Sequence, residues 1–154
     1  MERKLLSKAI EIAKLNVDDG GGPFGAVIVK DGKVISSAAN SVTGNNDPTA
    51  HAEILAIRQA ADKLGTWNLE GCELYTSCEP CPMCMGAVYW AHLDKVYYAC
   101  DHKDARNAGF DDSEIYSELK KNPKDRKLPI IQDLREEGLG AFKKWMDKED
   151  REEY

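Results

Sequence analysis

The sequence predicts an α/β fold in which helices pack on one mixed sheet of five strands. Three features of its 154 residues indicate this class. The first segment has helical spacing of apolar residues, two short apolar runs joined by Asp-Gly follow it, and short strands then alternate with helices. The length and an ordinary globular composition fit a single domain over residues 1–154.

The first three elements are expected to be a helix and a β-hairpin. Residues 4–17 repeat apolar side chains near helical spacing, and a glycine run follows them. Residues 25–30 and 33–36 are rich in β-branched side chains. Asp31-Gly32 joins these two runs, and both residue types tolerate the positive φ of a tight hairpin turn.

Helices and strands alternate after the hairpin. Asp47-Pro48 is typical of an N-cap followed by the first helical residue, which predicts a helix from Thr49 to about Leu64. The expected elements after it are a strand at 73–77, a helix at 82–91, a strand at 95–100, an ordered loop at 101–113, a helix at 113–121, a fifth strand at 128–132 and a helix at 139–149.

Charge and hydropathy restrict the possible partners. The chain has 21 Lys and Arg against 27 Asp and Glu, a net charge of −6 that is spread evenly along it. Proteins that bind a phosphate backbone need clustered basic residues, so nucleic acid is disfavoured and a small-molecule substrate is favoured. No apolar run is long enough for a membrane span, and no secretory signal is apparent. The expected location is the cytoplasm, with no membrane partner.

The motif with most chemical content joins His51-Ala52-Glu53 to Pro80-Cys81-Pro82-Met83-Cys84. Two cysteines separated by two residues can present both thiolates to one ion from the first turn of a helix. With His51 they make three protein ligands, which leaves the fourth position of a catalytic zinc for water. Glu53 is close enough in sequence to share the cavity without being a ligand, and it is expected to carry protons.

This motif is the signature of the zinc nucleobase deaminases, and the sequence resembles that superfamily. Residues 22–29, 45–53 and 109–113, and the terminal Glu153-Tyr154, are similar to the bacterial guanine deaminases. The resemblance implies a three-layer α/β/α cytidine deaminase-like fold, with helices on both faces of a mixed five-stranded sheet. It also implies one Zn²⁺ per subunit.

The resemblance further implies hydrolysis of guanine to xanthine and ammonia, with zinc hydroxide attacking the base and Glu53 as the proton shuttle. It assigns Phe24 and Asn40 to the base pocket and Asp112 to the departing amine. Trp90, on the helix after the cysteines, is assigned to the substrate pocket, with core packing as the alternative reading of that residue.

The same resemblance implies a homodimer with an exchanged C-terminal segment, about residues 134–154. The exchange would bring the terminal Tyr154 of one subunit to the guanine pocket of the other. From composition alone, this charged terminus is expected to be frayed and dispensable.

Two other functions share parts of the pattern. A tRNA-specific adenosine deaminase has the same zinc signature, but it needs an RNA-binding surface that the net charge and the acidic tail disfavour. A structural zinc would be filled by a fourth ligand, for which Cys78 is the available residue, and Glu53 would then be dispensable.

Overall fold

The computed structural model describes residues 1–154, which divide into two compact units, Met1–Asp112 and Ser113–Tyr154. The first unit contains the sheet and all the expected metal ligands, and the second contains only helices and irregular segments. Each unit is described by itself.

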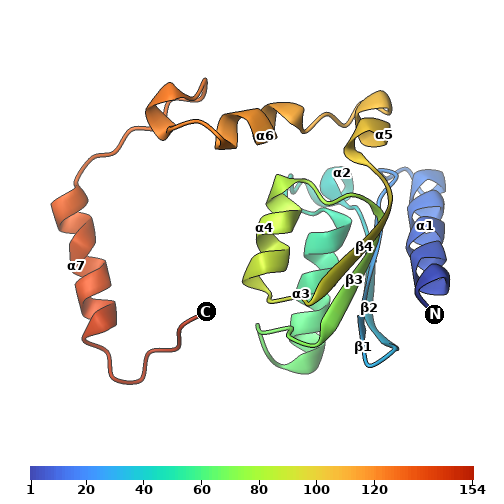
Figure 1. The fold of residues 1–154 in the computed structure, drawn as a ribbon, viewed down its shortest axis with the longest axis horizontal. Coiled ribbons are helices and arrows are strands. Elements are labelled where there is room, and N and C mark those ends of the chain that lie inside the picture. The colour runs from blue at the N-terminus through green and yellow to red at the C-terminus, as the bar shows by residue number, and fades with distance from the viewer. The chain divides into compact units, whose positions relative to one another are not determined.

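The sheet of the first unit has four strands in the order β2-β1-β3-β4 (Figure 1). Strand β1 is antiparallel to both of its neighbours, and β3 is parallel to β4, so the sheet is mixed as predicted. The parallel pair requires a crossover, which the helix α4 (Pro82–Trp90) supplies. The strands are β1 (Gly25–Lys30), β2 (Lys33–Ala39), β3 (Cys72–Cys78) and β4 (Lys95–Cys100).

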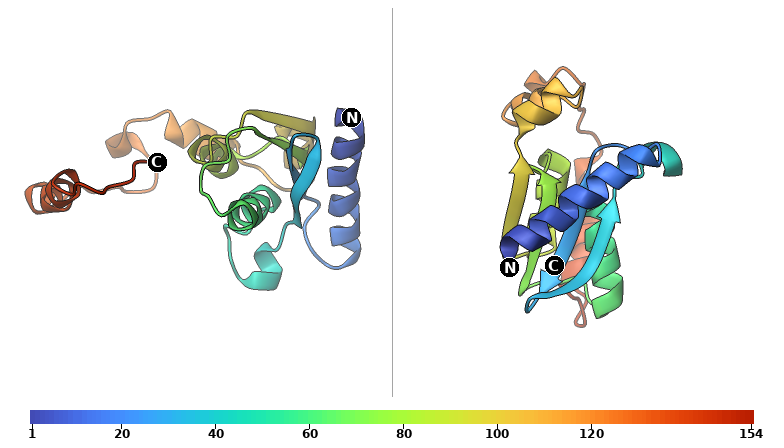
Figure 2. Two further views of the ribbon diagram at one scale, coloured as in Figure 1. Left: turned by 90° about the horizontal axis from the view of Figure 1, so that it is seen from below. Right: turned by 90° about the vertical axis from the view of Figure 1, so that its right-hand side faces the viewer.

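Helices cover both faces of this sheet, which confirms the predicted three layers (Figure 2). Side chains alternate along β1, so Ala26 and Ile28 face one side while Val27 and Val29 face the other. The first pair packs in a cluster with α3 and α4, and the second packs with α1. The helices of this unit are α1 (Glu2–Asp18), α2 (Val42–Asn45), α3 (Ala52–Leu64), α4 (Pro82–Trp90) and α5 (His102–Asn107).

Gly25 permits the close approach of α1 to the start of β1. A Cβ atom at this position would lie 2.4 Å from the backbone oxygen of Ala9 and 2.8 Å from the backbone nitrogen of Ala13. Backbone atoms in a packed helix cannot move aside as a flexible side chain can, so the packing of this layer requires glycine.

Two expected elements of the first unit differ in the structure. The helix predicted from Thr49 begins at Ala52 with His51 as its N-cap. Asp47 and Thr49 belong to a separate turn closed by Ala50 N donating to Asp47 O, and the helical hydrogen bonds begin with Leu55 N donating to His51 O. The region predicted as a loop over 101–113 contains α5, which begins with a capping box in which Asp101 and Asp104 each accept from the other's backbone nitrogen.

The prediction of a fifth strand is wrong, since residues 128–132 are irregular and the sheet has four strands. A strand is stabilised by a hydrogen-bonded neighbour, and Pro129 contributes no N–H to one. The apolar side chains of this segment are largely exposed, up to 86% for Ile131. The second unit consists of α6 (Ser113–Leu119), a short 3₁₀ turn at Pro123–Asp125 and α7 (Arg135–Met146).

None of the helices is both long enough and apolar enough to cross a membrane.

Candidate metal centre and active site

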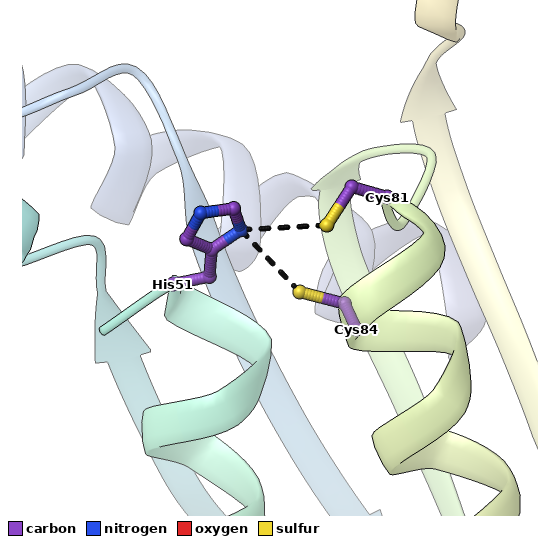
Figure 3. Close-up of side chains that lie close together, drawn as sticks. All are labelled: His51, Cys81 and Cys84. Atoms are coloured by element: carbon purple, nitrogen blue, oxygen red, sulfur yellow. Dashed lines mark hydrogen bonds between the residues drawn. The ribbon is translucent and has the colours of Figure 1, made fainter. Parts of the chain in front are cut away.

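His51, Cys81 and Cys84 converge between the N-terminal ends of α3 and α4 (Figure 3). His51 is the N-cap of α3 and Cys81 the N-cap of α4, where Pro82 occupies the first helical position. The Nδ1 atom of His51 lies 3.6 Å from the Sγ of Cys81 and 3.5 Å from the Sγ of Cys84.

These distances fit a tetrahedral zinc ion. With Zn–S near 2.3 Å and Zn–N near 2.0–2.1 Å, two ligand atoms of such a site are about 3.6 Å apart. One imidazole and two thiols are the donor set that zinc prefers, and their ligand atoms all lie within 4.8 Å of one another. The described residues therefore fit one Zn²⁺ with three protein ligands.

The electrostatics of the cluster favour a thiolate at Cys81. Hydrogen bonds from Cys84 and His51 lower the pKa of Cys81 to about 4, although burial acts in the opposite direction. The hydrogen bond with Cys81, together with burial, raises the pKa of Cys84. The hydrogen bond with Cys81 also raises the pKa of His51. A bound metal cation would stabilise the thiolate forms of the two cysteines, because binding of the ion displaces the remaining thiol proton.

Glu53 is buried beside the cluster, only 5% exposed, in the first turn of α3. Its Oε1 accepts a 3.5 Å hydrogen bond from Oγ1 of Thr76, and its Oε2 accepts one of 3.5 Å from Sγ of Cys84. Burial raises the pKa of this carboxyl. A carboxyl whose charged form is disfavoured by burial is suited to accepting a proton and releasing it again.

Backbone hydrogen bonds bring Phe24 and Asn40 toward the His51 segment. The nitrogen of Asn40 donates to the oxygen of Phe24 (3.0 Å), and the nitrogen of Ser41 donates to the oxygen of Ala50 (2.9 Å), the residue before His51. The carbonyl of Asn40 is held in turn by the side chain of Asn16 at 2.9 Å. The two predicted pocket residues thus belong to the same end of the sheet as the cluster.

Asp112 lies within electrostatic range of the cluster. Burial raises its pKa, and the charge of Cys81 adds to this effect while that of His102 opposes it. Its Oδ1 is buried without a hydrogen-bond partner, which is uncommon for a carboxyl and typical of a functional group. Phe110, two residues earlier, packs edge-on against Phe24 with ring centroids 4.9 Å apart.

Two predicted pocket residues are not brought to the cluster within the first unit. Trp90 is the last residue of α4, about 13 Å further along the helix axis than Cys81, and is 64% exposed. Tyr154 ends the second unit and is 74% exposed. His92, for which the sequence suggested no role, follows α4 and places its ring 5.6 Å from that of Trp67.

Three contacts around the site are not predicted by the sequence motifs. They are the hydrogen bond from Thr76 to Glu53, the packing of Phe110 on Phe24, and a contact between Glu79 and His102. The last has a partial signal in the sequence, because Glu79 and His102 each come shortly after the end of a strand, Glu79 directly after β3 and His102 after β4 with only Asp101 between. Side chains at the carboxyl ends of neighbouring parallel strands meet.

Comparisons with known proteins agree with this site. The model of the cytidine and deoxycytidylate deaminase zinc-binding region matches residues 1–100. The chain is 52% identical over 150 residues to the guanine deaminase of Bacillus subtilis (strain 168), covering 97% of this chain and 96% of that one. It is 49% identical over 94 residues to the tRNA-specific adenosine deaminase of Aquifex aeolicus, covering 61% and 62%.

Solved structures show the same similarity. The X-ray structure of guanine deaminase from Bacillus subtilis matches with a TM-score of 0.96 and 51% identity, over 99% of this chain and 98% of that one. A second structure, a point variant in complex with 8-azaguanine, matches with a TM-score of 0.71 and 34% identity, over 73% and 65%.

Proposed function

The chain belongs to the cytidine and deoxycytidylate deaminase family, and we propose that it hydrolyses guanine to xanthine and ammonia. The observation that carries this function is the 52% identity to a guanine deaminase along nearly the whole of both chains. The matches to tRNA-specific adenosine deaminases are shorter, as in the relative from Aquifex aeolicus, which covers 61% of this chain. Guanine is therefore favoured over adenosine in tRNA.

His51, Cys81 and Cys84 hold the zinc ion. When bound, zinc supplies Lewis-acid activation of the water that attacks the base. The geometry of the donor atoms supports this assignment, since their spacing is that of a tetrahedral site with one position left open.

Glu53 moves the protons. Its carboxylate takes a proton from the attacking water, delivers one to ring N3 of guanine and then serves the departing amine. Burial supports this role, because it raises the pKa of Glu53 and so reduces the free-energy difference between its charged and neutral forms. The contacts with Thr76 and Cys84 orient the two oxygens.

Phe24, Asn40 and Asp112 form the base pocket. The ring of Phe24 stacks on the purine, the side-chain amide of Asn40 binds a polar edge of the base, and Asp112 binds the amine as it leaves. The unpartnered buried Oδ1 of Asp112 supports the last role, because an amine or ammonium group would satisfy it. Trp90 is assigned to the same pocket only on its place in α4, the helix that begins at the cysteines.

Tyr154 completes the pocket from a second subunit, by exchange of about residues 134–154 in a homodimer. An amphipathic ring would close over the base and exclude water. Deleting Tyr154 is expected to leave zinc content and melting temperature unchanged and to lower the rate on guanine. A truncated protein with wild-type kinetics would contradict the role of this residue.

We keep the cytoplasm as the proposed location, since a reducing compartment preserves the five free cysteines.

Xanthine formation by the purified zinc-loaded protein tests the proposed function. Guanine and an anticodon stem-loop RNA are compared at equal concentration, with xanthine and inosine separated by chromatography. The expected result is turnover of guanine and none of the RNA. Absence of guanine turnover in protein with one zinc per chain would refute the assignment, and inosine formation would favour the tRNA function.

A further inference from the structure

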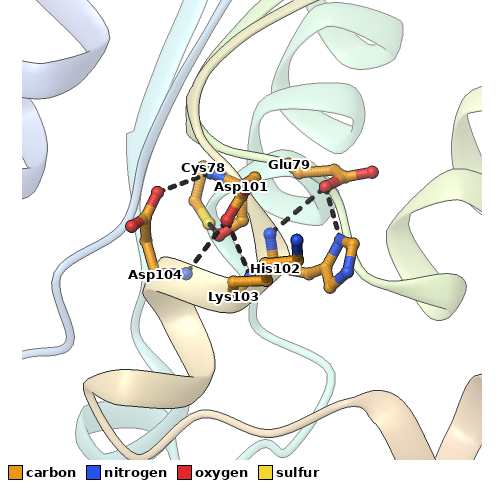
Figure 4. Close-up of polar contacts among 6 residues, drawn as sticks. All are labelled: Cys78, Glu79, Asp101, His102, Lys103 and Asp104. Atoms are coloured by element: carbon orange, nitrogen blue, oxygen red, sulfur yellow. Dashed lines mark hydrogen bonds and ion pairs between the residues drawn. The ribbon is translucent and has the colours of Figure 1, made fainter.

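Glu79 joins the loop that carries a metal ligand to the start of α5 (Figure 4). Its backbone nitrogen donates to the oxygen of Cys100 at 2.8 Å. Its Oε2 accepts a hydrogen bond from the backbone nitrogen of His102 at 3.2 Å and lies 2.8 Å from the Nδ1 of the same histidine. Three contacts thus hold one residue against the junction between β4 and α5.

The sheet places these residues together. Cys78 and Cys100 are paired in register at the ends of the parallel strands β3 and β4, so the residues that follow them meet. A carboxylate only accepts hydrogen bonds, so the Nδ1 of His102 carries the hydrogen of this contact. The side chains of His102 and Glu79 are 40% and 28% exposed, so the contact is partly shielded from water.

On one side, Glu79 is directly connected to the metal cluster. Only Pro80 separates it from Cys81, and Pro80 is fully buried. The proline ring fixes φ and leaves this short connection little conformational freedom. A shift of Glu79 would therefore also move Cys81 and its Sγ.

On the other side, His102 begins the helix that leads to Asp112. The capping box of Asp101 fixes the first turn of α5, and the Sγ of Cys78 donates to the oxygen of Asp101 at 3.6 Å. At the end of α5, the nitrogen of Phe110 donates to the oxygen of Ala105 at 2.9 Å. Burial raises the pKa of Asp112 and the charge of His102 opposes this effect, which agrees with their being near each other.

We propose that His102 is a positioning residue for this enzyme: by donating to Glu79, it holds the Cys81 loop and the segment that ends in Asp112 in one fixed arrangement. The part of the proposal that concerns Asp112 rests on the proposed function, and the part that concerns Cys81 does not. Loss of the contact loosens a metal ligand and misplaces the carboxyl that receives the amine, whereas Asn40 remains held by its hydrogen bonds with Phe24 and Asn16.

Three variants separate this role from a general effect on folding. His102→Ala removes the donor, and His102→Asn restores it, because the Asn Nδ2 takes nearly the place of the His Nδ1. Lys103→Ala is the matched control, since this exposed neighbour contributes only its backbone nitrogen to the capping box. Each protein is prepared with one zinc per chain, and two quantities are measured: the rate of zinc release to a chelator without substrate, and kcat and KM on guanine.

Removal of a group that orients a metal ligand typically lowers metal affinity or activity by about 10–100-fold. His102→Ala is expected to speed zinc release by about tenfold and to lower kcat by about 10–100-fold, with KM within about twofold. His102→Asn and Lys103→Ala are expected to remain near wild type in both measurements. Wild-type values in His102→Ala, or no recovery in His102→Asn, would overturn the proposal.

Zinc release separates failure of this inference from failure of the proposed function. If the wild-type protein does not turn over guanine but zinc release accelerates in His102→Ala and recovers in His102→Asn, the positioning of Cys81 stands and only the substrate is wrong. If guanine is turned over normally by all three variants, the proposed function stands and the positioning role is refuted.

Discussion

Glu53→Gln removes one negative charge from the site and keeps the size of the side chain. Glu53 is 5% exposed and lies 3.5 Å from both Thr76 and Cys84, so the substituted amide occupies the same buried position. Proton transfer by a positioned side chain contributes about 10²–10⁴-fold to a rate. We expect kcat to fall by that factor, which corresponds to about 3–5 kcal/mol of transition-state stabilisation.

The same substitution is expected to leave zinc content unchanged and to stabilise the metal-free protein. Burial raises the pKa of Glu53 above 4.5, so its contribution to stability is fully present below about pH 4.5 and is lost as pH rises through the folded-state pKa. A neutral amide avoids that loss. Metal-free Glu53→Gln protein should therefore melt at or above the wild-type temperature at pH 7, and this advantage should disappear in acid.

Initial rates of xanthine formation, zinc content and thermal unfolding are measured on the same preparations. Glu11→Gln is the control, because Glu11 is an exposed glutamate on α1 and the same charge is removed. The reasoning is refuted if zinc-loaded Glu53→Gln retains more than about a tenth of the wild-type kcat. Loss of zinc in this variant would show instead that the carboxylate is a ligand.

Three further outcomes follow from the geometry. Cys81→Ser should lose both zinc and activity, whereas Cys100→Ser should keep its zinc, which metal analysis measures. Zinc retained without Cys81 would mean that the ligands are wrongly assigned. The hydrogen bond with Cys81 raises the pKa of His51 above 6.5. Because protonated His51 cannot bind zinc, zinc affinity measured by chelator competition should fall by an additional factor of about ten per pH unit below that pKa. A pH-independent affinity would exclude His51 as a ligand. Gly25→Ala should destabilise the protein by about 1–3 kcal/mol, because its Cβ would lie 2.4 Å from a backbone oxygen of α1. Gly140→Ala, in open space on α7, should stabilise the protein slightly. Thermal unfolding compares the two variants, and equal effects would contradict the packing argument.

The ligand set and Glu53 could be predicted from the sequence because their arrangement is mainly local. Cys81 and Cys84 share the first turn of one helix, and His51 and Glu53 share the start of another. A spacing of three residues at a helix start places the side chains of Cys81 and Cys84 on the same face, whatever the rest of the fold does. The two helix starts then needed only one sheet to bring them together.

Pairing between distant segments could not be predicted in the same way. Residues 128–132 have the composition of a strand, but a strand requires a partner, and the four-stranded sheet includes none of them. The N-cap of α3 is His51 rather than the predicted Asp47, because the chain from Asp47 to Ala50 closes a separate turn before the helix. In both cases competing contacts, rather than local preference, decided the outcome.

The sequence by itself determined the zinc chemistry, the hairpin and the alternation of strands and helices in the first unit. Only the tertiary structure decided that Glu79 meets His102 and that Oδ1 of Asp112 is buried without a partner. The contact between Glu79 and His102 depends on the register of β3 against β4, which sets two residues 23 positions apart 2.8 Å from each other. Register is a property of the assembled sheet, and a short sequence motif contains no information about which residue of a distant strand will lie opposite.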